Sequence, residues 1–296
     1  MVGNKSGRGR ISGIIINIIL ILFALACILP ALLVISISLS SMDAIYESGY
    51  TFLPRGFNFK AYEYIFKDMG QILTSYWVSI RVVLVGGFVS VLLTALIAYP
   101  MSKRSFRYKK QITFIIFFTM LFNGGLVPSY MLMTNMLQLK NTIWSLILPY
   151  LISGWNVMMV RTFFQGLPEE IFEAATVDGC GEYRIFFTIV LPMSKPAIAT
   201  IALLQVLKYW NDWWLGLLYI EQDNLVPLQY MLYRLMNNIS EMQRQMMEGL
   251  GLGADEFPTE PARMAMAVVA AGPMLCVFPF FQKYFAKGMT VGAVKG

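Results

Sequence analysis

Apolar residues along the chain gather in six long runs that are separated by shorter polar segments. Each run is close to the ~20 residues that a helix needs to cross the hydrocarbon core of a bilayer. The first is longer than the apolar core of a signal peptide, so we expect it to remain as a helix. The pattern predicts an all-α, polytopic membrane protein with six transmembrane helices, at residues 11–39, 76–101, 112–133, 142–164, 197–220 and 262–284.

The segments between the runs predict the rest of the organisation. Residues 40–74 are polar and rich in turn formers, which indicates an external loop with one short amphipathic helix. Residues 221–261 are acidic and form a second expected external loop. We therefore divide the chain into a first helix with its loop, a five-helix core and a short tail, at residues 1–75, 76–286 and 287–296.

Glycine and proline interrupt the third run at Gly124, Gly125 and Pro128. These residues weaken a helix locally. A hinge, close helix packing and a simple bend all fit this pattern.

Composition supports the membrane assignment and narrows the chemistry. Of the 296 residues, 57% are hydrophobic and 14% are charged, whereas soluble domains carry about 25% charged residues. Histidine is absent, and the three cysteines have no metal-site or disulfide spacing. The sequence contains no GxxxxGK[ST] phosphate loop, so any ATP is expected on another chain. We expect this chain to bind no cofactor.

The distribution of basic residues predicts the orientation. Lys and Arg are about twice as frequent in the segments on the side of the N-terminus as on the opposite side. Basic residues favour the cytoplasmic side of a membrane. We therefore expect both termini to be cytoplasmic. The net charge of +6 then reflects topology and does not indicate a nucleic-acid partner.

A charged, glycine-containing segment at residues 165–195 separates the fourth and fifth runs, on the expected cytoplasmic side. Pro168 suits the first turn of a helix, and Glu169 favours its positive N-terminal end. Gly179 and Gly181 are expected to end the helix and allow the chain to reverse. The residues alone predict a helix–glycine–helix elbow, and an ordinary surface loop is equally compatible with them.

The elbow also carries a recognisable motif. Glu173-Ala-Ala, then Gly179, then Ile189-x-Leu191-Pro192, resembles the EAA loop of bacterial ABC importer permeases. The stretches "FNGGLVPSYMLM", "WNDWW", "PLQYML" and "FPFFQKYFAKGMTVGAVKG" are similar to the second permease subunit of maltose-type oligosaccharide importers. The resemblance implies a coupling elbow that docks on an ATPase through Glu170, Glu173, Ala174, Ala175, Asp178, Gly179, Leu191 and Pro192.

This resemblance implies a type I ABC importer permease fold in the bacterial cell membrane. It further implies a second permease subunit, two ATPase subunits that bind ATP and Mg, and an extracellular solute-binding protein. Oligosaccharides are the implied cargo, and a non-sugar solute is the alternative. A membrane enzyme would need a nucleophile or a carboxylate cluster. Apart from charges near the ends of the runs, the charged residues within them are Arg81, Lys208 and Asp212, which argues against an enzyme.

Two further sites have alternative interpretations. Lys208 and Asp212 are four residues apart and are expected to share a helix face. Tyr209, Trp210, Asn211 and Asp212 could line the sugar path, and an interfacial aromatic belt with a local ion pair fits the same residues. In the tail, Gly292 and Lys295 could contact the ATPase subunits, and a solvated terminus is the alternative.

Overall fold

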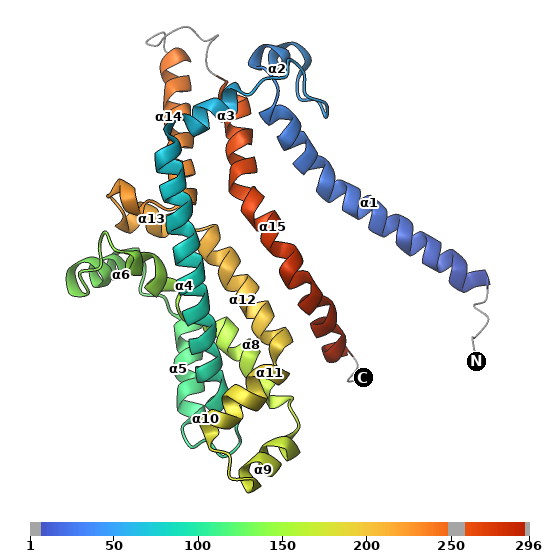
Figure 1. The fold of residues 1–296 in the computed structure, drawn as a ribbon, viewed down its shortest axis with the longest axis vertical. Helices are drawn as coiled ribbons and strands as arrows, with labels where there is room; N and C mark the ends of the chain where they lie inside the picture. The colour runs from blue at the N-terminus through green and yellow to red at the C-terminus, as the bar shows by residue number, and fades with distance from the viewer. Residues whose placement is uncertain (1–6, 248–257, 294–296) are drawn as a thin grey trace. The chain divides into compact units, whose positions relative to one another are not determined.

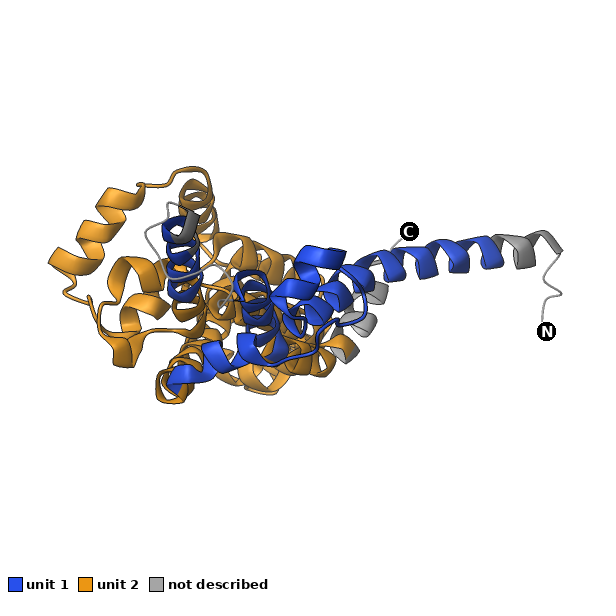
Figure 2. Ribbon diagram, turned by 90° about the horizontal axis from the view of Figure 1, so that it is seen from above, with its two compact units in different colours: residues 1–68, 234–272 blue, residues 69–233, 273–296 orange. Residues whose placement is uncertain are grey.

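The computed structural model describes residues 7–247 and 258–293, and side chains within a slightly narrower part of these ranges. These residues form helices and connecting segments without a β-strand. The chain divides into two compact units, residues 1–68 with 234–272 and residues 69–233 with 273–296 (Figure 2). The longest helices, labelled in Figure 1, are α1 (Gly7–Ser38), α4 (Met69–Ser102), α12 (Lys195–Trp210), α14 (Leu228–Met247) and α15 (Thr259–Ala293).

The first unit contains α1 and the structured segment that follows it. Every side chain from residue 14 to residue 32 is exposed, although nearly all are apolar, as expected of a helix surrounded by lipid. The following segment includes α2 (Met42–Ser48) and α3 (Lys60–Ile65). Backbone hydrogen bonds join the two ends of its first part: Ser41 N–H donates to Arg55 O at 3.0 Å, and Asn58 N–H donates to Leu39 O at 3.1 Å. It is therefore an ordered turn-rich segment.

Close packing of α4 against α12 and α8 (Gly154–Gln165) builds the second unit. Small residues on α4 allow this approach. At Gly86, an added Cβ would lie 2.8 Å from the ring of Tyr209 on α12. One turn further along α4, Ser90 Oγ accepts a hydrogen bond of 2.6 Å from Gln205 Nε2. The buried polar pair and the glycine contact fix the two helices against each other.

Three helices are long and apolar enough to cross a membrane, at residues 13–38, 60–102 and 259–282. Three bent helix pairs pass the same test together, and counting each pair as one span gives six among the described residues. The bends are 114° between α5 (Lys109–Leu121) and Leu126–Met136, which comprises α6 (Leu126–Met131) and the π-helical segment η2 (Leu132–Met136), 52° in the fourth run and 81° before α12. The predicted all-α, polytopic fold is confirmed.

The structure differs from the prediction in the third, fourth and fifth runs and in the second external loop. The third run is not one helix, because α5 ends at Leu121 and Gly125 has a φ of +87° that only glycine adopts readily. The fourth run is divided into Ile143–Tyr150 and Gly154–Gln165, with a bend of 52° between them. In the fifth run, helix α12 ends at Trp210, and a separate helix α13 (Trp214–Tyr219) follows. The expected external loop at residues 221–261 contains α14. Amphipathic α14 lacks the continuous apolar run by which the spans were found.

Candidate coupling site

Helix α9 (Glu169–Val177) forms the first arm of the elbow at residues 165–195. Pro168 precedes it with a φ of −59°, and Glu169 and Glu170 occupy its first turn. Negative side chains at this position interact favourably with the positive end of the helix dipole. The proline and the two glutamates therefore favour a helix start at the position that the sequence predicted.

A Schellman motif ends α9 at the expected glycine. Gly179 has a φ of +76°, and its N–H donates to Thr176 O at 3.0 Å. Cys180 N–H donates to Ala175 O at 2.9 Å, which completes the paired bonds of the motif. The chain then reverses and enters the second arm, α10 (Glu182–Ile185), the π-helical segment η4 (Phe186–Val190) and α11 (Leu191–Met193). The predicted helix–glycine–helix elbow is present.

An apolar cluster attaches the elbow to the helices of the second unit. Ala175 of the motif is 7% exposed and is the point where α9 enters this cluster. Phe172 and Cys180 pack against it from the two sides of the glycine reversal. The other elbow residues in the cluster come from the second arm, and the partners come from α4, α8 and α12: Ile185, Phe186, Val190, Ala95, Ala98, Tyr99, Met101, Val157, Val160, Phe164 and Ile201.

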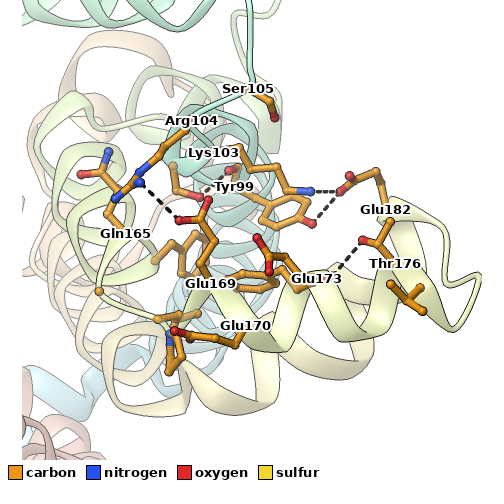
Figure 3. A pocket seen from close by; sticks show the side chains of 17 residues that line it. Tyr99, Lys103, Arg104, Ser105, Gln165, Glu169, Glu170, Glu173, Thr176 and Glu182 are labelled. Atoms are coloured by element: carbon orange, nitrogen blue, oxygen red, sulfur yellow. Dashed lines mark hydrogen bonds and ion pairs between the residues drawn. The ribbon is translucent and has the colours of Figure 1, made fainter.

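Electrostatic contacts add a second attachment at the end of α4 (Figure 3). Lys103 forms an ion pair with Glu182, and Tyr99 Oη donates a hydrogen bond of 2.7 Å to the same carboxylate oxygen. The hydrogen bonds from Lys103 and Tyr99 hold the pKa of Glu182 below its ordinary value. A second pair, Arg104 with Glu169 at 3.4 Å, is largely exposed and contributes little.

A cleft of about 770 Å³ lies between α9 and the C-terminal end of α4. Figure 3 shows Lys103 and Arg104 on the α4 side, facing acidic residues of the elbow. Glu170 and Glu173 also line the cleft, and both are exposed. The elbow thus presents a charged, accessible surface on one side, and the apolar cluster and the Lys103–Glu182 pair hold its other side.

Two exposed apolar side chains extend this surface and were not predicted from the sequence. Val177 is 87% exposed and Tyr183 is 80% exposed. Both side chains are therefore accessible to a partner on this face of the elbow. Of the predicted docking residues, Ala174, Asp178, Gly179 and Pro192 are exposed, Leu191 is half-buried and Ala175 faces the core.

The second predicted cluster lies where α12 ends. Tyr209 and Trp210 are 4% and 5% exposed, and Tyr209 Oη donates to Ile147 O at 2.9 Å. Asn211 is exposed, and its Nδ2 donates to Leu207 O at 2.9 Å. Burial of the two aromatic side chains serves helix packing, whereas Asn211 lies at the helix end.

The expectation that Lys208 and Asp212 share a helix face is wrong, because α12 ends at Trp210. Asp212 instead accepts a hydrogen bond from Tyr150 Oη at 2.8 Å and another from Leu215 N–H at 3.1 Å. Lys208 Nζ lies 4.0 Å from the centre of the Tyr150 ring. The three side chains therefore meet around a tyrosine.

Gly292 lies in the last turn of α15, and Lys295 lies outside the described residues. The described residues hold no cluster of His, Cys, Asp or Glu side chains that could bind a metal ion.

A multi-helix membrane chain with an exposed EAA elbow defines the class of ABC importer permeases. The sequence matches the family described as "binding-protein-dependent transport system inner membrane component" over residues 1–291, and the chain belongs to this family. Its members are membrane permease components of ABC importers, and ATP hydrolysis is carried out by a separate subunit. In general they work with a partner permease, ATPase subunits and a solute-binding protein.

Individual relatives agree with this assignment along most of their length. The chain is 38% identical to the polygalacturonan/rhamnogalacturonan transport system permease protein YtcP of Bacillus subtilis, covering 98% of this chain and 100% of that protein. It is 29% identical to the arabinooligosaccharide permease AraQ of Halalkalibacterium halodurans, over 92% and 93% of the two chains. A solved bacterial ABC transporter that imports the acidic polysaccharide alginate superposes with a TM-score of 0.79 at 28% identity, covering 96% of this chain and 100% of that chain.

Proposed function

We propose that this chain is the permease subunit of an oligosaccharide importer and that α9 is its docking element for the ATPase. The named relatives concern polygalacturonan, arabinooligosaccharides and alginate, which all favour a saccharide cargo over a non-sugar solute. ATP and Mg are then bound by the partner ATPase subunits. Both termini and the elbow lie on the cytoplasmic side.

One observation carries this proposal: the elbow is exposed on its outer surface and firmly attached on its inner surface. Glu173 and Val177 are open to a partner, while Ala175 and Glu182 are held by the core and by Lys103. A partner that moves α9 therefore also moves the helices packed behind it. In this way closure of the ATPase pair changes which side of the membrane the sugar path opens to.

The other predicted residues take supporting roles in the proposal. Asn211 and Asp212 belong to the external part of the path, where the exposed Asn211 amide can bind sugar hydroxyls and Asp212 holds Tyr150 in place. The buried rings of Tyr209 and Trp210 form the wall behind them. The tail with Gly292 and Lys295 reaches the ATPase subunits on the cytoplasmic side.

The test uses the complete importer reconstituted in proteoliposomes with its binding protein. Glu173→Lys reverses a charge on the exposed surface of α9, and we expect the ATPase subunits to co-purify less and saccharide uptake to fall at least about tenfold. Asp43→Lys makes the same change in the exposed first turn of α2 and is the matched control. Full uptake and full ATPase content in the Glu173→Lys complex would refute the docking role.

A further inference from the structure

Lys208 is a charged side chain on α12 whose hydrogen-bonding capacity is not used within the described part of the chain. Its side chain is exposed, and its ammonium group makes no hydrogen bond or ion pair there. The group lies over the face of Tyr150 at 4.0 Å, a cation–π contact that positions it without occupying its N–H donors. Three donors therefore remain available to a ligand.

The nearby carboxylate of Asp212 does not accept a hydrogen bond from the Lys208 ammonium group. Both oxygens of Asp212 accept other hydrogen bonds, one from Tyr150 Oη and one from Leu215 N–H. Asp212 thus fixes the tyrosine on which Lys208 lies. The arrangement holds an ammonium group in place and leaves it open on one side.

A charge in a membrane-spanning helix is costly unless it faces water, a cavity or a partner. Lys208 lies thirteen residues after the start of α12, which places it about 20 Å along the helix from the cytoplasmic end. On the proposed orientation this is the external part of the path. A substrate that enters from outside meets the ammonium group early.

We propose that Lys208 selects acidic oligosaccharides by binding the carboxylate of a uronic-acid residue as it enters the path. An ammonium–carboxylate hydrogen bond is stronger than a hydrogen bond between neutral groups, and it does not form with a neutral sugar. The inference rests on the proposed saccharide import and adds the substrate class. Two of the relatives named above concern acidic polymers, polygalacturonan and alginate, which is consistent with this choice.

The experiment compares trigalacturonate with its fully methyl-esterified form, which keeps the sugar rings and removes the charges. Uptake of each is measured with the reconstituted complex and the same binding protein throughout. The readout is the ratio of kcat/KM for the acid to kcat/KM for the ester, because a change in folding or protein level cancels in this ratio. The variants are Lys208→Met, Lys208→Arg and, as a matched control, Lys60→Met at the exposed start of α3.

We expect the wild type to prefer the acid and Lys208→Met to reduce that preference about tenfold, since a hydrogen bond to a charged group contributes roughly that factor or more. Lys208→Arg and Lys60→Met should retain it. An unchanged ratio in Lys208→Met overturns the inference and leaves saccharide import intact. So does an equal loss for both substrates, which would mark Lys208 as a structural or lipid-contacting residue. If the wild type imports neither substrate nor any other saccharide, both this inference and the proposed function fail.

Discussion

Lys103 and Glu182, 79 positions apart in the sequence, form an ion pair that joins the end of α4 to the start of α10. Tyr99, one turn before Lys103, donates to the same carboxylate. The Lys103 side chain is 25% exposed and that of Glu182 is 64% exposed. The ion pair therefore lies in a partly aqueous environment, and its value is in fixing the geometry of the elbow more than in global stability.

Glu182→Gln should uncouple transport from ATP hydrolysis while the protein stays folded. The amide keeps an oxygen that can accept from Tyr99 and loses the charge that attracts Lys103. We expect at most about 1 kcal/mol of lost stability and a several-fold lower ratio of saccharide imported to ATP hydrolysed. Glu169→Gln removes the more exposed pair with Arg104 and should leave the ratio unchanged. Equal ratios in both variants would show that the Lys103–Glu182 pair has no part in coupling.

Acidification should weaken the same attachment. Hydrogen bonds from Lys103 and Tyr99 lower the pKa of Glu182 in the folded protein. A lowered folded-state pKa contributes stability that is fully present above the ordinary glutamate pKa, about 4.3, and is lost as the pH falls through the lowered value. The melting temperature of wild type in detergent should therefore exceed that of Glu182→Gln at pH 6. The difference between the two melting temperatures should vanish once the pH has fallen below the lowered pKa of Glu182. A difference that stays constant from pH 6 to below pH 4 contradicts this assignment.

Gly179 and Gly181 offer a matched pair of substitutions in the elbow. An added Cβ would meet no atom within 4 Å at either position, so space is not the issue. Gly179 has a φ of +76°, whereas Gly181 has a φ of −71°. Gly179→Ala should cost about 1 kcal/mol and should increase proteolysis at the elbow, while Gly181→Ala should behave as wild type. Identical proteolysis rates would mean that the Schellman motif does not set the elbow's conformation.

Gly86 and Gly87 provide a similar comparison within the membrane. A Cβ at Gly86 would lie 2.8 Å from the Tyr209 ring, whereas at Gly87 the nearest atom is 3.9 Å away, on Val206. Gly86→Ala should therefore separate α4 from α12 and cost about 1–3 kcal/mol, the usual range for overpacking. Gly87→Ala should be tolerated. Thermal unfolding in detergent checks both, and equal melting temperatures would argue against the tight α4–α12 contact.

The elbow could be predicted because its signals are local. Pro168, the glutamates after it and Gly179 act on the backbone within a few residues, so their effects can be read in sequence order. The ion pair of Lys103 with Glu182 could not be found in this way, since it depends on how α4 and α10 meet in space.

The membrane spans show the same limit. Hydropathy located the third and fifth runs, but it does not report the direction in which a chain continues. Gly124, Gly125 and Pro128 marked the weak point in the third run without giving its 114° bend. An apolar run that continues as one unbroken helix predicts Lys208 and Asp212 on the same helix face. The end of α12 at Trp210 overturned that prediction.

The central claim is that the outer surface of α9 contacts the ATPase in the working importer. Its most direct measurement is photo-cross-linking from a single cysteine at Val177, after Cys27, Cys180 and Cys276 are replaced by serine. Leu53, 78% exposed on the predicted external segment, is the control position. We predict that the cysteine at 177 cross-links to the ATPase subunit and is protected from impermeant reagents in intact cells, while the cysteine at 53 shows the reverse. A transport-competent complex in which position 177 is labelled from outside and never cross-links to the ATPase would contradict the account.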